Sequence, residues 1–156
     1  MTTTARPHVV HASCVVVGEA GVLLRGPSGS GKSTLARRVV EEAQRRGLFA
    51  RLVGDDRILI AVQAGRLLAR PHPALAGAIE VRGTGIVETE HAGDAVVRLV
   101  VDCGALDTRF PALEQRFTDI LGVRLPLLSA NPSQADAVLL RLSARSSPLE
   151  TELPSA

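Results

Sequence analysis

The most constraining feature of this sequence is the segment 26–33, which reads GPSGSGKS. It fits G-x-x-x-x-G-K-[ST], the pattern of a phosphate-binding loop, or P-loop. The apolar run 22–24 before it is typical of a strand, and after it Leu35, Val39 and Ala43 share one helical face. A strand, a glycine-rich loop and an amphipathic helix in this order predict an α/β domain that binds phosphate groups.

Each part of the loop has a chemical role. Its glycines allow a tight turn whose amide N–H groups face an anion, and the positive end of the next helix adds to that field. Lys32 is expected to reach the β- and γ-phosphates, and the Ser33 hydroxyl to ligate Mg²⁺. The loop contacts phosphates only; ATP is expected as the commonest nucleotide, and no N-K-x-D element for guanine occurs. The predicted nucleotide-binding residues are Gly26, Pro27, Ser28, Gly29, Ser30, Gly31, Lys32, Ser33 and Thr34.

Acidic residues follow two predicted strands. Asp55 and Asp56 end the strand 50–53, where one could act as a base and the other bind metal or orient a group, although Asp is also common in turns. Asp102 ends an apolar strand and is a rival Mg²⁺ ligand. From the residues alone, Glu80 is as well explained by a solvated strand face as by a functional site. A lone histidine such as His11 is usually structural.

The remaining pattern predicts one folded domain over residues 8–143, with a flexible lead 1–7 and a disordered polar tail 144–156. Strands are expected at 9–17, 22–25, 50–53, 78–81 and 96–101, a turn at 19–21, a hairpin from 58–62 and 66–69, and a helix at 33–46 ended by Gly47. Asn131 and Pro132 are expected to begin a last helix. Residues 109–128 have no clear pattern, and the hairpins favour a mixed sheet.

Composition excludes several classes of function. The formal net charge of +2 is too small for bulk binding to nucleic acid or an anionic membrane, and three Phe with no Trp or Tyr leave few rings for stacking on bases. Neither a signal peptide nor a membrane-spanning run is visible, so a cytoplasmic location is expected. Cys14 and Cys103 lie in apolar runs and are expected to be buried thiols.

Taken together, these segments resemble a known family. The order His11-Ala12-Ser13, GVLLRGPSGSGKS, LVGDDR and IEVRGTGIV resembles the catalytic domain of bacterial HPr kinase/phosphorylase, most closely its short single-domain members. The resemblance covers about residues 8–143, with its specific motifs in 11–87. It implies a P-loop domain with a mixed sheet, related in fold to phosphoenolpyruvate carboxykinase.

The resemblance also implies roles for individual residues. It makes Lys32 and Ser33 the P-loop lysine and the magnesium-binding serine. It makes Asp55 and Asp56 the aspartate pair, one of which activates the substrate serine, and leaves open which. Glu80 matches a magnesium-associated glutamate and His11 an active-site histidine. The implied activity is Mg-ATP-dependent phosphorylation of a serine of the phosphocarrier protein HPr. Full-length relatives are hexamers, and whether this chain is also a homo-oligomer stays open.

The sequence departs from the family pattern at three places. Thr84 stands where the family usually has Leu, and Thr34 where it often has Glu. No arginine follows the strand-like Val123-Arg124-Leu125-Pro126 at the position that the family uses in catalysis and dephosphorylation, and phosphorylase activity is put in doubt more than kinase activity. Two other functions stay open: a small-molecule, nucleotide-type kinase, and an ATP-binding regulatory protein with little catalysis.

Overall fold

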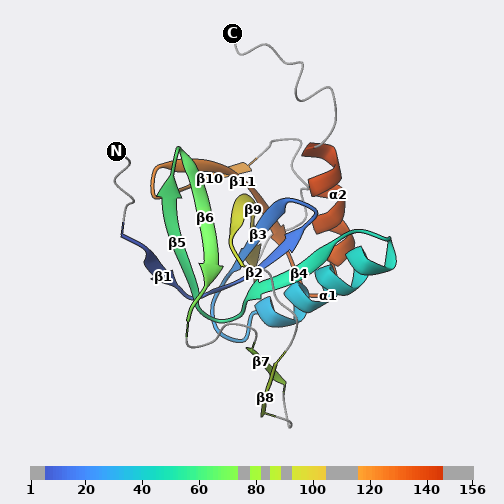
Figure 1. The fold of residues 1–156 in the computed structure, drawn as a ribbon. Helices are drawn as coiled ribbons and strands as arrows, with labels where there is room; N and C mark the ends of the chain where they lie inside the picture. The colour runs from blue at the N-terminus through green and yellow to red at the C-terminus, as the bar shows by residue number, and fades with distance from the viewer. Residues whose placement is uncertain (1–5, 74–77, 82–84, 89–92, 105–115, 146–156) are drawn as a thin grey trace.

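The computed structural model describes residues 6–73, 78–81, 85–88, 93–104 and 116–145, with backbone only for 78–81 and 85–88. Within these residues, one large mixed sheet carries two helices (Figure 1). Its strands are β1 (His8–Val10), β2 (Ala12–Val17), β3 (Ala20–Arg25), β4 (Ala50–Gly54), β5 (Ile58–Gln63), β6 (Arg66–Pro71), β9 (Ala95–Cys103), β10 (Arg116–Ile120) and β11 (Val123–Ala130). The other elements are β7 (Ala78–Val81) paired with β8 (Gly85–Glu88), and helices α1 (Lys32–Arg45) and α2 (Ala135–Arg145).

The centre of the sheet is parallel and its flanks are antiparallel. Strands β3, β9 and β11 run parallel, and β2 pairs antiparallel with β3 and β4. On the other side, β6 pairs antiparallel with the start of β9, and β5 and then β1 follow β6. This topology confirms the predicted α/β class with a mixed sheet. No helix among the described residues is long and apolar enough to cross a membrane.

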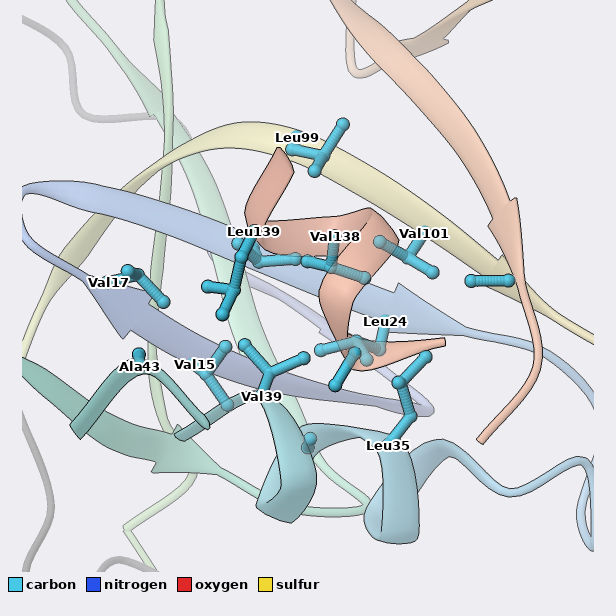
Figure 2. Packing of buried hydrophobic residues seen from close by; sticks show 14 of the residues in the cluster. Val15, Val17, Leu24, Leu35, Val39, Ala43, Leu99, Val101, Val138 and Leu139 are labelled. Atoms are coloured by element: carbon cyan, nitrogen blue, oxygen red, sulfur yellow. The ribbon is translucent and has the colours of Figure 1, made fainter. Parts of the chain in front are cut away.

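Apolar side chains pack on both faces of the sheet. On one face α1 and α2 lie side by side, and Figure 2 shows Leu35, Val39, Val138 and Leu139 meeting strand residues such as Leu24. On the other face, side chains of β5 and β6 pack against those of β2, β3 and β9, so the sheet curls on itself. Cys14 lies in this second cluster and Cys103 in the first, and both are buried free thiols, as expected.

Helix α1 forms where the sequence predicts it, shifted by one residue at each end. Its buried positions include Leu35, Val39 and Ala43 on one face. It ends in a pair of hydrogen bonds, from the Gly47 N–H to the Gln44 carbonyl at 3.0 Å and from the Leu48 N–H to the Ala43 carbonyl at 2.9 Å. This is the Schellman arrangement, so Gly47 terminates the helix as expected.

Two predicted boundaries near the P-loop are wrong. The strand expected over 9–17 is interrupted by a bend at His11, because β1 pairs with β5 whereas β2 pairs with β3 and β4. The turn expected at 19–21 lies at 18–19, and Gly21 belongs to β3. Gly21 serves close packing, since a Cβ there would lie 2.7 Å from the carbonyl oxygen of Val96 in β9.

The C-terminal region also differs from expectation. Asn131 and Pro132 do not start α2, which begins at Ala135; instead the Asn131 side chain accepts a hydrogen bond from the Ser133 N–H at 2.9 Å and closes a turn before the helix. The unassigned stretch 109–128 contains β10 and the first part of β11, while its residues 109–115 lie outside the described ones. Helix α2 continues to Arg145, and most of the lead 1–7 and tail 144–156 lies outside the described residues.

Candidate active site

The P-loop joins the end of β3 to the start of α1, at the carboxyl end of the parallel strands. The first turn of α1 carries no acidic side chain, and its N-cap, Gly31, makes no side-chain cap. The amide groups of this turn and the positive end of the helix dipole therefore suit an anionic group. Ligands of α/β sheets bind at this edge, so the loop has the location that the phosphate-binding pattern predicts.

Lys32 is buried against the loop that it follows. Its ammonium group donates hydrogen bonds to the carbonyl oxygens of Gly26 at 2.8 Å and Pro27 at 3.2 Å. The only lysine of the chain is thus held over the loop that would surround the phosphates. A cation at this place can neutralise the charge of β- and γ-phosphates.

Ser33 and Asp55 form the first of two polar pairs beside the loop. The Ser33 hydroxyl lies 2.8 Å from Oδ1 and 3.0 Å from Oδ2 of Asp55. Asp55 is only 7% exposed. Helix α1 supplies the serine and the end of β4 supplies the aspartate. Hydroxyl and carboxylate oxygens are the hard ligands that Mg²⁺ prefers, and Mg²⁺ takes its other ligands from phosphates and water. The pair fits the predicted magnesium site.

His11 and Asp56 form the second pair. His11 Nε2 lies 2.5 Å from Asp56 Oδ1, and their side chains are 49% and 59% exposed. The bend between β1 and β2 faces the turn between β4 and β5, because β1 pairs with β5 and the Ala12 N–H donates to the Asp56 carbonyl at 3.2 Å. Sheet pairing therefore brings together two predicted site residues that are 45 positions apart.

Adjacent aspartates point in different directions because the backbone is irregular there. A β-bulge shifts the register of β2 and β4 between Cys14 and Val15, just before the acidic pair. Asp56 then adopts a left-handed conformation with φ of 71°. Bulges and positive φ values redirect side chains. As a result Asp55 turns toward α1 and Asp56 toward the surface.

The rival metal ligand, Asp102, has a different partner. Asp102 Oδ1 accepts a hydrogen bond from Nε of Arg25 at 2.5 Å, and these two residues are register partners in β3 and β9. The Arg25 guanidinium also donates to the Thr118 hydroxyl at 3.2 Å. The Ser33 hydroxyl is thus hydrogen-bonded to Asp55, whereas Asp102 forms an ion pair with Arg25. Of these two candidate metal ligands, Asp55 is the one that lies beside the serine of the loop.

Comparison with known proteins decides the family. The family model described as the HPr Serine kinase C-terminal domain matches residues 2–100, which include the loop, both aspartates and His11. The chain belongs to this family. It is 32% identical to the HPr kinase/phosphorylase of Chlorobium phaeobacteroides over 148 residues, an alignment covering 86% of this chain and 42% of that protein. It is 37% identical to the enzyme of the same name from Mycoplasma mycoides over 78 residues, covering 50% of this chain and 23% of that protein.

A solved structure shows the same fold. The HPr(Ser) kinase/phosphatase of Coxiella burnetii superimposes with a TM-score of 0.72 at 21% identity, covering 89% of this chain and 98% of that one. The likeness confirms the fold expected from the resemblance. The chain spans less than half the length of the two curated relatives named above.

Other family-pattern residues are less fully described. Glu80 lies in β7, whose side chains are not described, so its link to magnesium stays a prediction; Thr84 lies outside the described residues. Pro27 and Ser28 are exposed in the loop, and Thr34 is half-buried in the first turn of α1. Arg124 lies in β11 with its guanidinium 4.4 Å from the centre of the Phe117 ring.

One residue of the site was missed by sequence reasoning. The Ser13 hydroxyl donates to Asp55 Oδ1 at 2.5 Å from the buried strand β2. The signal available was a serine among apolar residues in a strand whose members are all buried. Such a hydroxyl needs a hydrogen-bond partner, and the partner here is an acid of the site.

Proposed function

We propose that this chain is a Mg-ATP-dependent protein serine kinase whose substrate is the phosphocarrier protein HPr. One observation carries the proposal: a buried Ser33–Asp55 pair and an exposed His11–Asp56 pair lie next to each other beside a P-loop. The buried first pair could hold the metal ion of a bound nucleotide. The exposed second pair could accept a proton from a second molecule, the substrate. The names of the relatives supply the substrate.

The nucleotide would be held by the loop. The backbone N–H groups of the loop, which Pro27 lacks, would face the phosphates, and Lys32 would leave its carbonyl partners to bind the β- and γ-phosphates. Ser33 and Asp55 would hold Mg²⁺, with Glu80 as a further ligand implied by the family pattern. Bound Mg²⁺ would neutralise charge on the γ-phosphoryl group.

The exposure of the two aspartates divides their roles. Asp55 is buried and accepts hydrogen bonds from two serines, so the hydroxyl of a protein substrate cannot easily reach it. Asp56 is exposed and has only His11 as a side-chain partner among the described residues. We therefore assign Asp55 to the metal and Asp56 to the substrate. His11 orients the Asp56 carboxylate.

The chemical step then follows. The substrate serine oxygen attacks the γ-phosphorus, the bond between that phosphorus and the oxygen bridging to the β-phosphate breaks, and ADP leaves. Asp56 accepts the serine proton, so its carboxylate becomes neutral as the new phosphoester forms. Positioning by the loop and charge neutralisation by Lys32 contribute most of the acceleration.

The test is transfer of labelled phosphate from ATP to purified HPr, with binding of ATP measured separately by calorimetry. Asp56→Asn should lower transfer by about 10²–10⁴-fold and leave ATP binding close to wild type, because only the proton acceptor is lost. Asp55→Asn should weaken Mg-dependent binding as well. Lys32→Ala should lower transfer by about 10²–10³-fold, the usual effect of losing a preorganised electrostatic donor.

Arg37→Ala is the matched control for Lys32. It removes one positive charge from the exposed face of the same helix, where Arg37 pairs with Glu41 at 3.7 Å, and should leave transfer unchanged. Normal phosphorylation of HPr by the Lys32 and aspartate variants would contradict the mechanism. Turnover of a nucleotide acceptor without HPr transfer would show a small-molecule kinase instead, and ATP binding without any transfer would show a regulatory protein.

A further inference from the structure

Ser13 stands out among the polar residues of the described chain. Three polar or charged side chains there are classed as buried, namely Ser13, Lys32 and Asp55. Lys32 and Asp55 already have places in the site. Ser13 is fully buried in a strand of apolar residues, and the function proposed above gives it no role.

The Asp55 carboxylate is held between two hydroxyl groups from two different elements. Ser13 in β2 donates to Oδ1 at 2.5 Å, and Ser33 at the start of α1 lies within reach of both oxygens, at 2.8 and 3.0 Å. A hydroxyl has a single proton to donate. Ser13 donates to Oδ1, which is also the oxygen nearer to Ser33, so Oδ2 is the less engaged oxygen and the one more available to a metal ion.

The two hydroxyls differ in how firmly they are placed. Strand β2 is paired on both sides, with β3 and β4, and Ser13 is the register partner of Leu24. Ser33 follows the P-loop directly, and its oxygen is the group that the family pattern assigns to Mg²⁺. Ser13 therefore approaches Asp55 from the rigid interior of the sheet, whereas Ser33 approaches it from the nucleotide side.

We propose that Ser13 is a positioning residue that fixes the rotation of the Asp55 carboxylate, so that one chosen oxygen faces the magnesium of Mg-ATP. The proposal rests on the function proposed above. Partners behind a metal-binding carboxylate orient it, and their loss typically weakens metal binding or activity by about 10–100-fold. Ser13 contacts neither nucleotide nor substrate in this role.

The experiment measures ATP affinity by calorimetry across a magnesium titration and in EDTA, for wild type, Ser13→Ala and Ser13→Thr. Ser13→Ala should raise the magnesium concentration for half-saturation about 10–100-fold, while affinity in EDTA stays at the wild-type value because the loop is intact. Ser13→Thr keeps the hydroxyl, and β-branched residues suit strands, so it should restore magnesium dependence.

Cys14→Ala is the matched control. It also removes one buried heavy atom from β2, but its side chain lies in the cluster on the opposite face of the sheet. It should lower the melting temperature without moving the magnesium half-saturation point. The proposal is overturned if Ser13→Ala leaves that point unchanged, if Cys14→Ala shifts it as much, or if Ser13→Ala weakens binding equally in EDTA. A wild-type protein whose ATP affinity does not respond to magnesium would instead refute the proposed function.

Discussion

The two cysteines are among the few groups of this chain that titrate between pH 8 and 12, because it has no tyrosine and a single lysine. Burial raises the pKa of Cys14 to about 12, against a small opposing effect of a backbone hydrogen bond from Val22. Burial also raises the pKa of Cys103 to about 11; nearby Lys32 lowers it and Asp102 raises it. Both thiols are protonated in the folded protein at neutral pH.

These shifts predict a loss of stability in alkali. The unfolded thiols release protons near the ordinary value of 9.0, whereas the folded thiols keep theirs to higher pH. The contribution of the two thiols to the free energy of unfolding should therefore be constant below about pH 8 and fall above pH 9, by on the order of 1 kcal/mol per thiol at pH 10. Urea unfolding of wild type and of a Cys14→Ala/Cys103→Ala variant at pH 8 and 10 checks this. Equal pH dependence in the two proteins would contradict it.

At the level of elements, the P-loop is braced by the segment that precedes α2. Gly31 has φ of 94°, and a Cβ there would lie 2.3 Å from Cγ of Pro132. The Pro132 carbonyl in turn accepts a hydrogen bond from Arg38 of α1 at 2.9 Å. The conformation of the loop therefore depends on a contact with residues about 100 positions later in the chain.

Gly31→Ala and Gly29→Ala separate this contact from backbone strain. Gly29 has φ of 82° but open space around a Cβ, so its substitution should cost only the left-handed strain, about 1–2 kcal/mol. Gly31→Ala adds a clash with Pro132 and should cost about 1–3 kcal/mol more, with a larger loss of ATP affinity. Urea unfolding and calorimetry measure both effects. Equal losses for the two variants would show that Pro132 does not brace the loop.

Sequence patterns located the local elements well and the non-local ones poorly. Helix α1 was predicted within one residue because its signals, the loop pattern and Gly47, lie directly beside it in the sequence. Strand β11 was not, because Pro126 suggests a break. In the structure Pro126 pairs only with β10, since pairing with β9 begins at Leu127, so its missing N–H costs no hydrogen bond there.

At the scale of the whole molecule, stability depends on the layer of two helices over the sheet. Leu139 and Leu140 are neighbours on α2, but Leu139 is 2% exposed in the core and Leu140 is 71% exposed (Figure 2 shows Leu139). Leu139→Ala should lower the free energy of unfolding by about 2–5 kcal/mol through lost burial and a cavity. Leu140→Ala should change it by about 0.5 kcal/mol or less. Similar costs in urea unfolding would mean that α2 is not packed as described.

The sequence by itself determined the phosphate-binding pattern of the loop and the residue types predicted to stand near it. The loop 26–33 is a local pattern, Asp55 and Asp56 are predicted site residues from their place after a strand, and His11 is predicted from the resemblance. The roles of the two aspartates could not be divided in this way. Neighbouring residues share the same local sequence, and nothing in that sequence states which of them faces inward.

Only the tertiary structure shows that the two carboxylates have different partners and different exposure. The bulge in β4 and the left-handed backbone at Asp56 turn one carboxylate toward Ser33 and Ser13 and the other toward His11. The partners come from β2, α1 and the bend after β1, which lie 22 to 45 positions away and meet through sheet pairing and the packing of α1 on the sheet. Side-chain direction is set by this irregular backbone together with the long-range hydrogen bonds, and for that reason the geometry of the site could not be predicted from the sequence alone.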